Sequence, residues 1–116
     1  MGKEEINAFL GASTVYTGKL TFQGTVRIDG VFNGEIDSDG MLIVGKDARV
    51  DGQLRLGELV LSGNFTGEAC VAHRATIHKT GVFTGKLNTR GLAVEEGAKL
   101  EGEIHMINLD EARLPA

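Results

Sequence analysis

The chain has 116 residues, of which 41% are hydrophobic and 24% charged, and its formal net charge is -4 at pH 7. This length suits one domain, and the absence of a strongly basic balance argues against nucleic acid as a partner. The single cysteine, Cys70, excludes an internal disulfide and a cysteine-based metal cluster, and it fits a reducing compartment such as the cytoplasm.

Residues 1–13 are predicted to form an N-terminal tail. We expect no signal peptide and no transmembrane helix, because no apolar run is long enough. Three apolar residues of the tail have helical spacing, so that one face of a short helix could contact a membrane. They are Ile6, Phe9 and Leu10. Two neighbouring glutamates oppose contact with an anionic surface, and a flexible tail or a strand that extends the next coil are the alternatives.

Residues 14–106 contain one short pattern six times: an apolar residue, any residue, Gly, any residue and a second apolar residue. The central glycines are separated by 16, 18, 15, 18 and 17 positions, being Gly18, Gly34, Gly52, Gly67, Gly85 and Gly102. A repeat of this length predicts a solenoid, because a single unit cannot bury its own apolar face and must stack on its neighbours.

Within each unit, apolar and polar residues alternate, as in AKLEGEI at 98–104, and this period of two predicts strands. A unit of about seventeen residues fits one coil of a parallel β-helix, with glycine at a corner where the backbone bends or approaches another closely. We therefore predict an all-β domain, a solenoid of about six coils with a three-sided cross-section. The shortest spacing, 15, between Gly52 and Gly67, predicts a shortened corner near residues 55–63.

Both end coils keep apolar residues where a capped solenoid has polar ones, which predicts that identical rods stack end to end. At the first-coil end these residues are Val15, Tyr16, Leu20 and Phe22. At the last-coil end they are Leu92, Val94, Leu100, Ile104 and Met106.

Residues 107–116 are predicted to form a C-terminal tail. Asn108 is a candidate helix cap, with Glu111 three residues later. A short helix here, folded over the end of the rod, would leave a monomer. The alternative function is then a β-helix binding module that does not polymerise.

Two strings resemble cofactor sites but lack an essential residue. Residues 40–47 match a phosphate-binding loop except that Asp47 replaces the Ser or Thr that binds magnesium, and an apolar strand fills the loop. Residues 35–40 resemble the start of a calcium loop, but Lys46 stands where a bidentate Glu is required. We expect no nucleotide, metal or other cofactor.

No arrangement of side chains indicates catalysis. His73, His78 and His105 lack the spacing of metal ligands and are predicted to lie on the surface. Cys70, among small apolar neighbours in EACVAH, is predicted to be a buried core residue.

One enzymatic alternative comes from an aliphatic residue at every sixth position, as in Val44, Val50 and Leu56. This spacing is typical of left-handed β-helix acyltransferases built from hexapeptide repeats. The spacing fails further on, where counting by six reaches Ser62 and Glu68.

Nearly the whole chain resembles one family. INAFLG (6–11), TVYTGKLTFQGTVRIDGVFNGEI (14–36), LIVGKDARVDGQ (42–53) and LAVEEGAKLEGEI (92–104) are similar to the bactofilins, bacterial cytoskeletal proteins. The resemblance implies a right-handed parallel β-helix that polymerises through its coil ends into nonpolar filaments, without nucleotide and without enzymatic activity. It also implies a cytoplasmic scaffold that positions cell-envelope or morphogenesis proteins. Some members attach to the membrane through a short N-terminal segment.

Overall fold

The structure, a computed structural model, describes residues 6–11 and 14–106, with residues 6–10 described by their backbone only. The regular elements in these residues are all strands. They are β1 (Ile6–Leu10), β2 (Val15–Phe22), β3 (Thr25–Ile28), β4 (Val31–Ser38), β5 (Met41–Val44), β6 (Arg49–Leu61), β7 (Asn64–Ile77), β8 (Val82–Thr89), β9 (Leu92–Val94) and β10 (Lys99–Met106).

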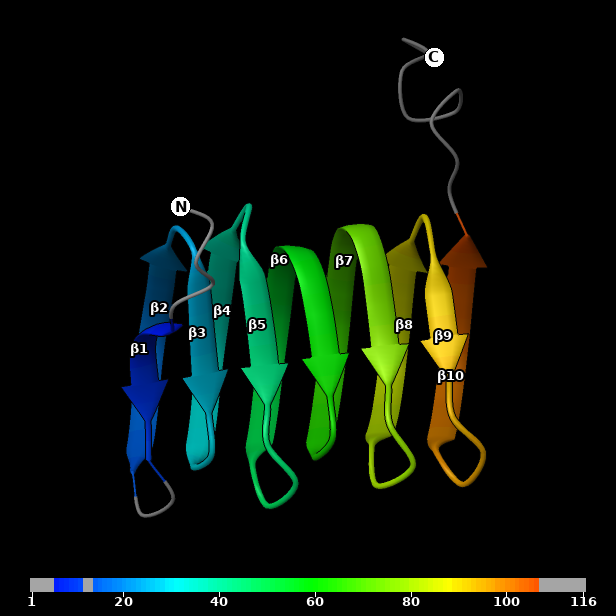
Figure 1. Ribbon diagram of the computed structural model, residues 1–116, viewed down its shortest axis with the longest axis horizontal. Coiled ribbons are helices and arrows are strands. Elements are labelled where there is room, and N and C mark those ends of the chain that lie inside the picture. Colours follow the sequence, from blue (N-terminus) through cyan, green and yellow to red (C-terminus); the bar gives the residue numbers. More distant parts are fainter. Residues whose placement is uncertain (1–5, 12–13, 107–116) are drawn as a thin grey trace, which may run out of the picture.

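The strands stack in two parallel ladders that lie on opposite sides of one rod (Figure 1). The first ladder joins β2, β4, the first part of β6, the first part of β7, β8 and β10. The second joins β1, β3, β5, the later parts of β6 and β7, and β9. In Figure 1 the second ladder runs downward in front and the first upward behind, while the chain advances from left to right. This is a right-handed coil, which agrees with the resemblance and excludes the left-handed hexapeptide alternative.

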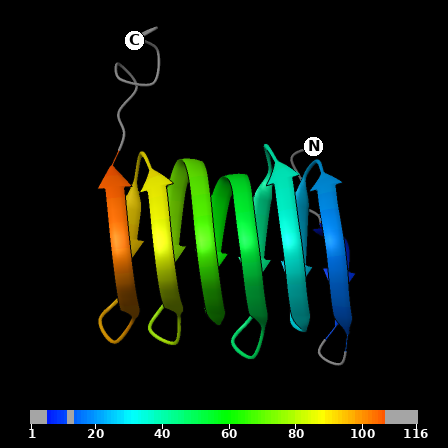
Figure 2. The same cartoon turned by 180° about the vertical axis from the view of Figure 1, so that it is seen from behind.

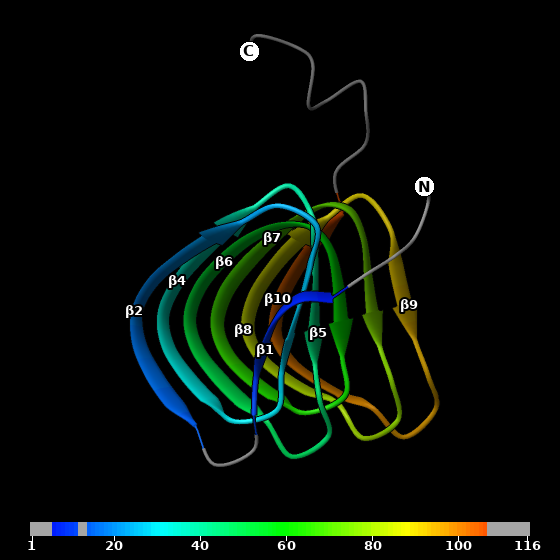
Figure 3. The ribbon, with the colours of Figure 1, turned by 60° about the vertical axis from the view of Figure 1, so that its left-hand side comes forward.

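The six repeated glycines lie in one column, each in register with the glycine of the next coil. Their φ angles lie between 121° and 141°, a region that other residues rarely adopt. Figure 3 shows that the strands of the first ladder curve along their length and so cover two sides of the rod, while the strands of the second ladder form the third side. The predicted β-solenoid is therefore confirmed, with about five turns between Gly18 and Gly102.

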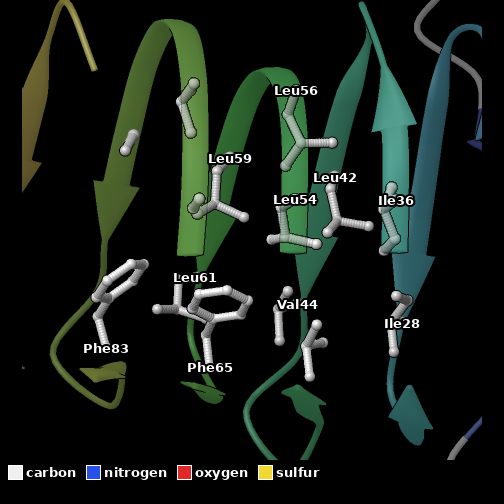
Figure 4. Packing of buried hydrophobic residues seen from close by; sticks show 14 of the residues in the cluster. Ile28, Ile36, Leu42, Val44, Leu54, Leu56, Leu59, Leu61, Phe65 and Phe83 are labelled. Carbon is white, nitrogen blue, oxygen red and sulfur yellow. The ribbon is translucent and has the colours of Figure 1, made fainter. Parts of the chain in front are cut away.

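The core consists of inward side chains stacked in columns along the rod (Figure 4). One column contains Phe32, Val50, Phe65 and Phe83, each at most 1% exposed. On each strand the neighbours of these buried residues point outward, so alternation along the strand separates the core from the surface. Burial of these apolar columns is the main stabilising contribution.

Two polar residues lie at inward corner positions, and each is fully hydrogen bonded. The Ser38 hydroxyl donates to the carbonyl oxygen of Phe22 at 2.7 Å and accepts from the N–H of Gly40 at 2.9 Å. Thr89 Oγ1 donates to the carbonyl oxygen of Gly91 at 2.9 Å, within its own corner, and accepts from the N–H of Gly91 at 3.3 Å. These bonds remove the cost of burying a polar group, so the corners can be polar without weakening the core.

The predicted shortening near residues 55–63 is also confirmed. Other coils close the corresponding corner with a four-residue turn, as where Ala48 N–H donates to the carbonyl oxygen of Gly45 (3.0 Å) and Gly81 N–H to that of His78 (2.7 Å). The corner between β3 and β4 lacks this turn as well. In the short coil, β6 ends at Leu61 and β7 begins only three positions later. The other corner of this coil has an irregular register between Leu56 and Glu58.

Two expectations from the sequence are corrected. Cys70 is exposed, because it lies between the inward residues Ala69 and Val71 and therefore points outward. Residues 6–10 form a strand paired with β3, which is the alternative of a strand that extends the coil, so the sheet begins before residue 14 and the helical arrangement of the three apolar residues is not observed. Contact of that segment with a membrane stays a prediction. The candidate cap at Asn108 lies outside the described residues.

Candidate functional site: the two ends and the sides of the rod

Stacking stops at the two ends of the rod. At one end, β2 pairs only with β4, and at the other, β10 pairs only with β8 (Figure 2). Each of these strands therefore has one edge without a strand partner among the described residues. Such an edge presents backbone N–H and C=O groups on which a further strand could pair.

The last-coil end exposes the cross-section of the core. Ile104 is 37% exposed and Met106 53% exposed, whereas the residues one coil inward in the same columns, Leu87 and Thr89, are fully buried. Val94 is likewise 44% exposed. Leu92 and Leu100 are partly buried against the core. All five residues predicted for this end therefore lie on the terminal coil.

The first-coil end brings three of its four predicted residues together. Tyr16 stacks on Phe32 with ring centroids 5.1 Å apart and planes 10° apart. Leu20 and Phe22 also pack against the core and are partly buried. Val15 differs, because it is 68% exposed in the outward row with Val31 and lies beside the core cross-section rather than in it.

The two ends carry opposite charge along their edge strands. The charged residue of β2 is Lys19, whereas β10 contains Lys99, Glu101 and Glu103. His105 Nε2 lies 3.3 Å from Glu103 Oε1, and both side chains are exposed. The net charge of the edge strand, with histidine neutral, is therefore positive at the first-coil end and negative at the last.

Glu95, a further acidic residue, lies at the corner that follows β9. Glu95 Oε1 accepts a hydrogen bond from the backbone N–H of Lys79 at 2.9 Å, and Oε2 lies 3.3 Å from His78 Nδ1. The bond from Lys79, followed by the contact with His78, lowers the pKa of Glu95. The pair joins the corners of two neighbouring coils. His73, His78 and His105 lie at or near the surface, as predicted.

The strings that resemble cofactor sites form strands and turns of the solenoid. The residues that the structure describes contain no group of three His, Cys, Asp or Glu that could hold a metal ion. The string at 40–47 forms strand β5 and a tight turn, and the N–H groups of Met41 and Gly45 donate to the preceding coil. Among the described residues, no helix is long and apolar enough to cross a membrane.

A polar groove of about 290 Å³ crosses the outward side of the long strands. Arg55 Nε lies 3.3 Å from Asp37 Oδ1 within it. The other charged or reactive side chains that line it are Lys19, Glu35, Glu68 and Cys70. Sequence inspection missed this groove, because its residues are 15 to 18 positions apart and meet only through the register of the coils.

Comparison with known proteins identifies the family. Residues 8–105 match the bactofilin family, described as polymer-forming cytoskeletal. The chain is 24% identical over 110 residues to bactofilin BacP of Myxococcus xanthus (strain DK1622), covering 95% of this chain and 46% of that protein. It therefore spans about half the length of this curated relative.

A solved structure has the same fold. A cryo-EM reconstruction of Thermus thermophilus bactofilin double helical filaments matches with a TM-score of 0.79 and 32% identity, covering 84% of this chain and 96% of that one. The family match extends over residues 8–105, and the fold match covers 84% of the chain. The chain belongs to the bactofilin family.

Proposed function

We propose that this protein is a non-enzymatic bacterial cytoskeletal scaffold that polymerises end to end through its two terminal coils. The exposure of the core columns at the last-coil end carries the proposal, since Ile104 and Met106 occupy positions that are buried one coil earlier. Soluble solenoids normally cover such ends with polar residues. Contact with a second end would bury these apolar side chains.

Polymerisation in this proposal requires no nucleotide. Removing apolar surface from water contributes about 25 cal/mol per Å², and the open strand edges add backbone hydrogen bonds when another edge meets them. The filament is a homopolymer in which like ends meet, as the family resemblance implies, giving a nonpolar strand. At each junction the apolar columns then outweigh the repulsion between two edge strands of the same net charge. Because the Thermus thermophilus relative forms double helical filaments, we propose that strands of this chain also associate in pairs.

The scaffold acts in the cytoplasm, where its polar sides bind client proteins of the cell envelope or of morphogenesis. The N-terminal segment that contains Ile6, Phe9 and Leu10 contacts the inner face of the membrane. Flotation with vesicles of anionic and of neutral lipids tests this contact. Wild-type protein should float with vesicles and the Phe9→Ser variant should not, whereas equal flotation of both would contradict the proposal.

Substitution at the end coil tests polymerisation. Ile104→Glu places a charge in the proposed contact and should shift the protein from the pellet to the supernatant in high-speed sedimentation. Thr66→Glu, at an exposed position on a middle coil, is the matched control and should pellet like the wild type. Equal pelleting of both variants would argue against the last coil as an interface.

The polar groove favours a second candidate, a β-helix binding module that does not polymerise. In that case the wild type would sediment as a discrete particle at all concentrations. Substitution of Arg55 would then change ligand binding, whereas substitution of Ile104 would leave the size of the particle unchanged.

A further inference from the structure

One side of the rod has an outward row without charge over four coils. The row contains Ile43, Val60, Thr76 and Ala93, which are in register on β5, β6, β7 and β9. All four are partly exposed. Figure 1 looks onto this side, which we call the short-strand face.

The other side of the rod differs. Its outward rows on the long strands carry charges, for example Lys19, Glu35, Glu68 and Lys86 in one row. A charged exterior is the ordinary state of a soluble protein, and an uncharged row in which three of four residues are apolar is a candidate contact surface. The row follows the rod axis over these four coils and ends at β3, where Arg27, which is paired with Asp29, occupies the same row.

We propose that the short-strand face binds the same face of a second copy of this chain, with the two rods antiparallel. This inference rests on the proposed pairing of filament strands, to which it assigns a surface and an orientation. The two rods are related by a two-fold axis (dyad) that lies in the interface, perpendicular to the rod axes and parallel to the strands. It passes midway between the later parts of β6 and β7. In this arrangement β5 faces β9 of the partner, and β6 faces β7 of the partner.

The side chains on this face are complementary in size under that symmetry. Ile43 meets Ala93 of the partner subunit, and Val60 meets Thr76 of the partner subunit. In the neighbouring outward row, Met41 meets the position of Gly91 of the partner subunit. Ile43 and Met41 therefore face small residues, and Val60 faces a residue of similar size, so no point of the contact brings two bulky side chains together.

The charges on the face are also complementary. Glu58 and Arg74 lie in register on neighbouring coils, and neither has an ion-pair partner within 4 Å among the described residues. In the antiparallel arrangement, Glu58 faces Arg74 of the partner subunit, and the dyad repeats this pair. Such charges at the edge of an interface fix orientation more than they add affinity.

Disulfide cross-linking tests the orientation directly. In a Cys70→Ser background, Ile43→Cys combined with Ala93→Cys should give a covalent dimer after mild oxidation, as judged on a non-reducing gel. Within one rod the two positions are separated by three ladder steps, about 14 Å at ~4.8 Å per step, which is too far for a disulfide. Ile43→Cys alone should stay monomeric on the gel. In the antiparallel arrangement, position 43 of one rod and position 43 of the partner rod are also three ladder steps apart.

Two outcomes would overturn the inference. An absence of dimer from the double variant would reject the contact, and an efficient dimer from Ile43→Cys alone would indicate parallel rods instead. The background variant Cys70→Ser with no added cysteine measures non-specific cross-linking. Failure of the wild type to form filaments would count against the proposed function, whereas the cross-link still tests the face between two rods in solution.

A charge on the face tests strand pairing in filaments. Val60→Arg should leave end-to-end filaments intact but reduce them to single strands in negative-stain electron microscopy. Glu58→Arg should have the same effect, and the exchange Glu58→Arg with Arg74→Glu should restore paired strands. The control Thr66→Arg lies on the long-strand side and should keep the wild-type width. Val60→Arg filaments of wild-type width would refute the proposal.

Discussion

In the column of repeated glycines, a residue must adopt a positive φ and must also leave room for the backbone of the preceding coil. Gly67 has a φ of 131°, and a Cβ atom there would clash with the carbonyl oxygen of Gly52 in the preceding coil. Gly97 also has a positive φ, of 102°, but a Cβ atom there would meet Lys79 only at ordinary contact distance, 3.4 Å. A comparison of Gly67 with Gly97 therefore separates the effect of backbone conformation on stability from the effect of coil stacking.

Gly67→Ala is therefore expected to destabilise the rod more than Gly97→Ala. Strained backbone costs about 1–3 kcal/mol, which both variants incur, and Gly67→Ala adds the displacement of a stacked coil. Urea unfolding followed by circular dichroism gives the two free energies of unfolding. Equal losses would mean that stacking does not require glycine in this column.

The Glu95 carboxylate gives a prediction for acid conditions. Its pKa in the folded state lies below the ordinary value of 4.5, because Lys79 N–H and His78 stabilise the charged form. The contribution to stability is present above the unfolded pKa and is lost as the pH falls through the folded pKa. Glu95→Gln should thus show a smaller loss of stability below about pH 4.5 than the wild type. Glu96→Gln, at the exposed neighbouring position, should follow the wild type.

Elements of this fold depend on one another, because each strand is stabilised by the coils on both sides. Phe65 is 1% exposed and packs on Phe83 with ring centroids 4.9 Å apart, in the middle of the rod. Tyr16 stacks on Phe32 in the same column but at the end. The column therefore contains one aromatic contact in the middle of the rod, at Phe65, and a similar contact at its partly exposed end, at Tyr16.

Phe65→Ala should lower the free energy of unfolding by about 3–5 kcal/mol, as expected for a buried aromatic side chain. Tyr16→Ala should cost clearly less, because its site is open at one side. Guanidinium unfolding of both variants, under conditions that keep the protein monomeric, provides the measurement. A greater loss at Tyr16 would contradict the assignment of the first coil as an open end.

Much of the element pattern could be predicted from the sequence, because the repeated glycine and the alternation of apolar residues determine strands and register together. Alternation fails as a guide where neighbouring residues are all small and apolar, which is why Cys70 was predicted to be buried. The short-strand face and the polar groove could not be predicted, since they depend on contacts between residues such as Ile43 and Val60 on different coils. The sequence does not decide between a strand and a helix at residues 6–10, because the spacing of so few apolar residues fits both.

On the scale of the whole molecule, the rod has two unlike ends and two unlike sides. The ends differ in the charge of their edge strands, and the sides differ in the presence of an uncharged row. The ends provide growth along the filament axis and the short-strand face provides lateral pairing. Substitution at one end should therefore limit length without removing the contact at the other end.

Leu100→Arg should stop end-to-end growth at two rods joined through the first-coil end, since like ends meet in the proposed filament, and lateral pairing would add only a second such pair. Analytical ultracentrifugation distinguishes dimers from monomers and from long polymers. The variant needs the same melting temperature as the wild type in circular dichroism, so that misfolding does not account for the result. Long filaments of the Leu100→Arg variant would exclude the last coil from the interface.

Negative-stain electron microscopy of the purified wild type, with no nucleotide and no added metal, tests the central claim most directly. The open core columns at the ends predict long, thin filaments in plain buffer. Discrete particles at micromolar concentration, confirmed by light scattering, would contradict end-to-end polymerisation driven by the terminal coils.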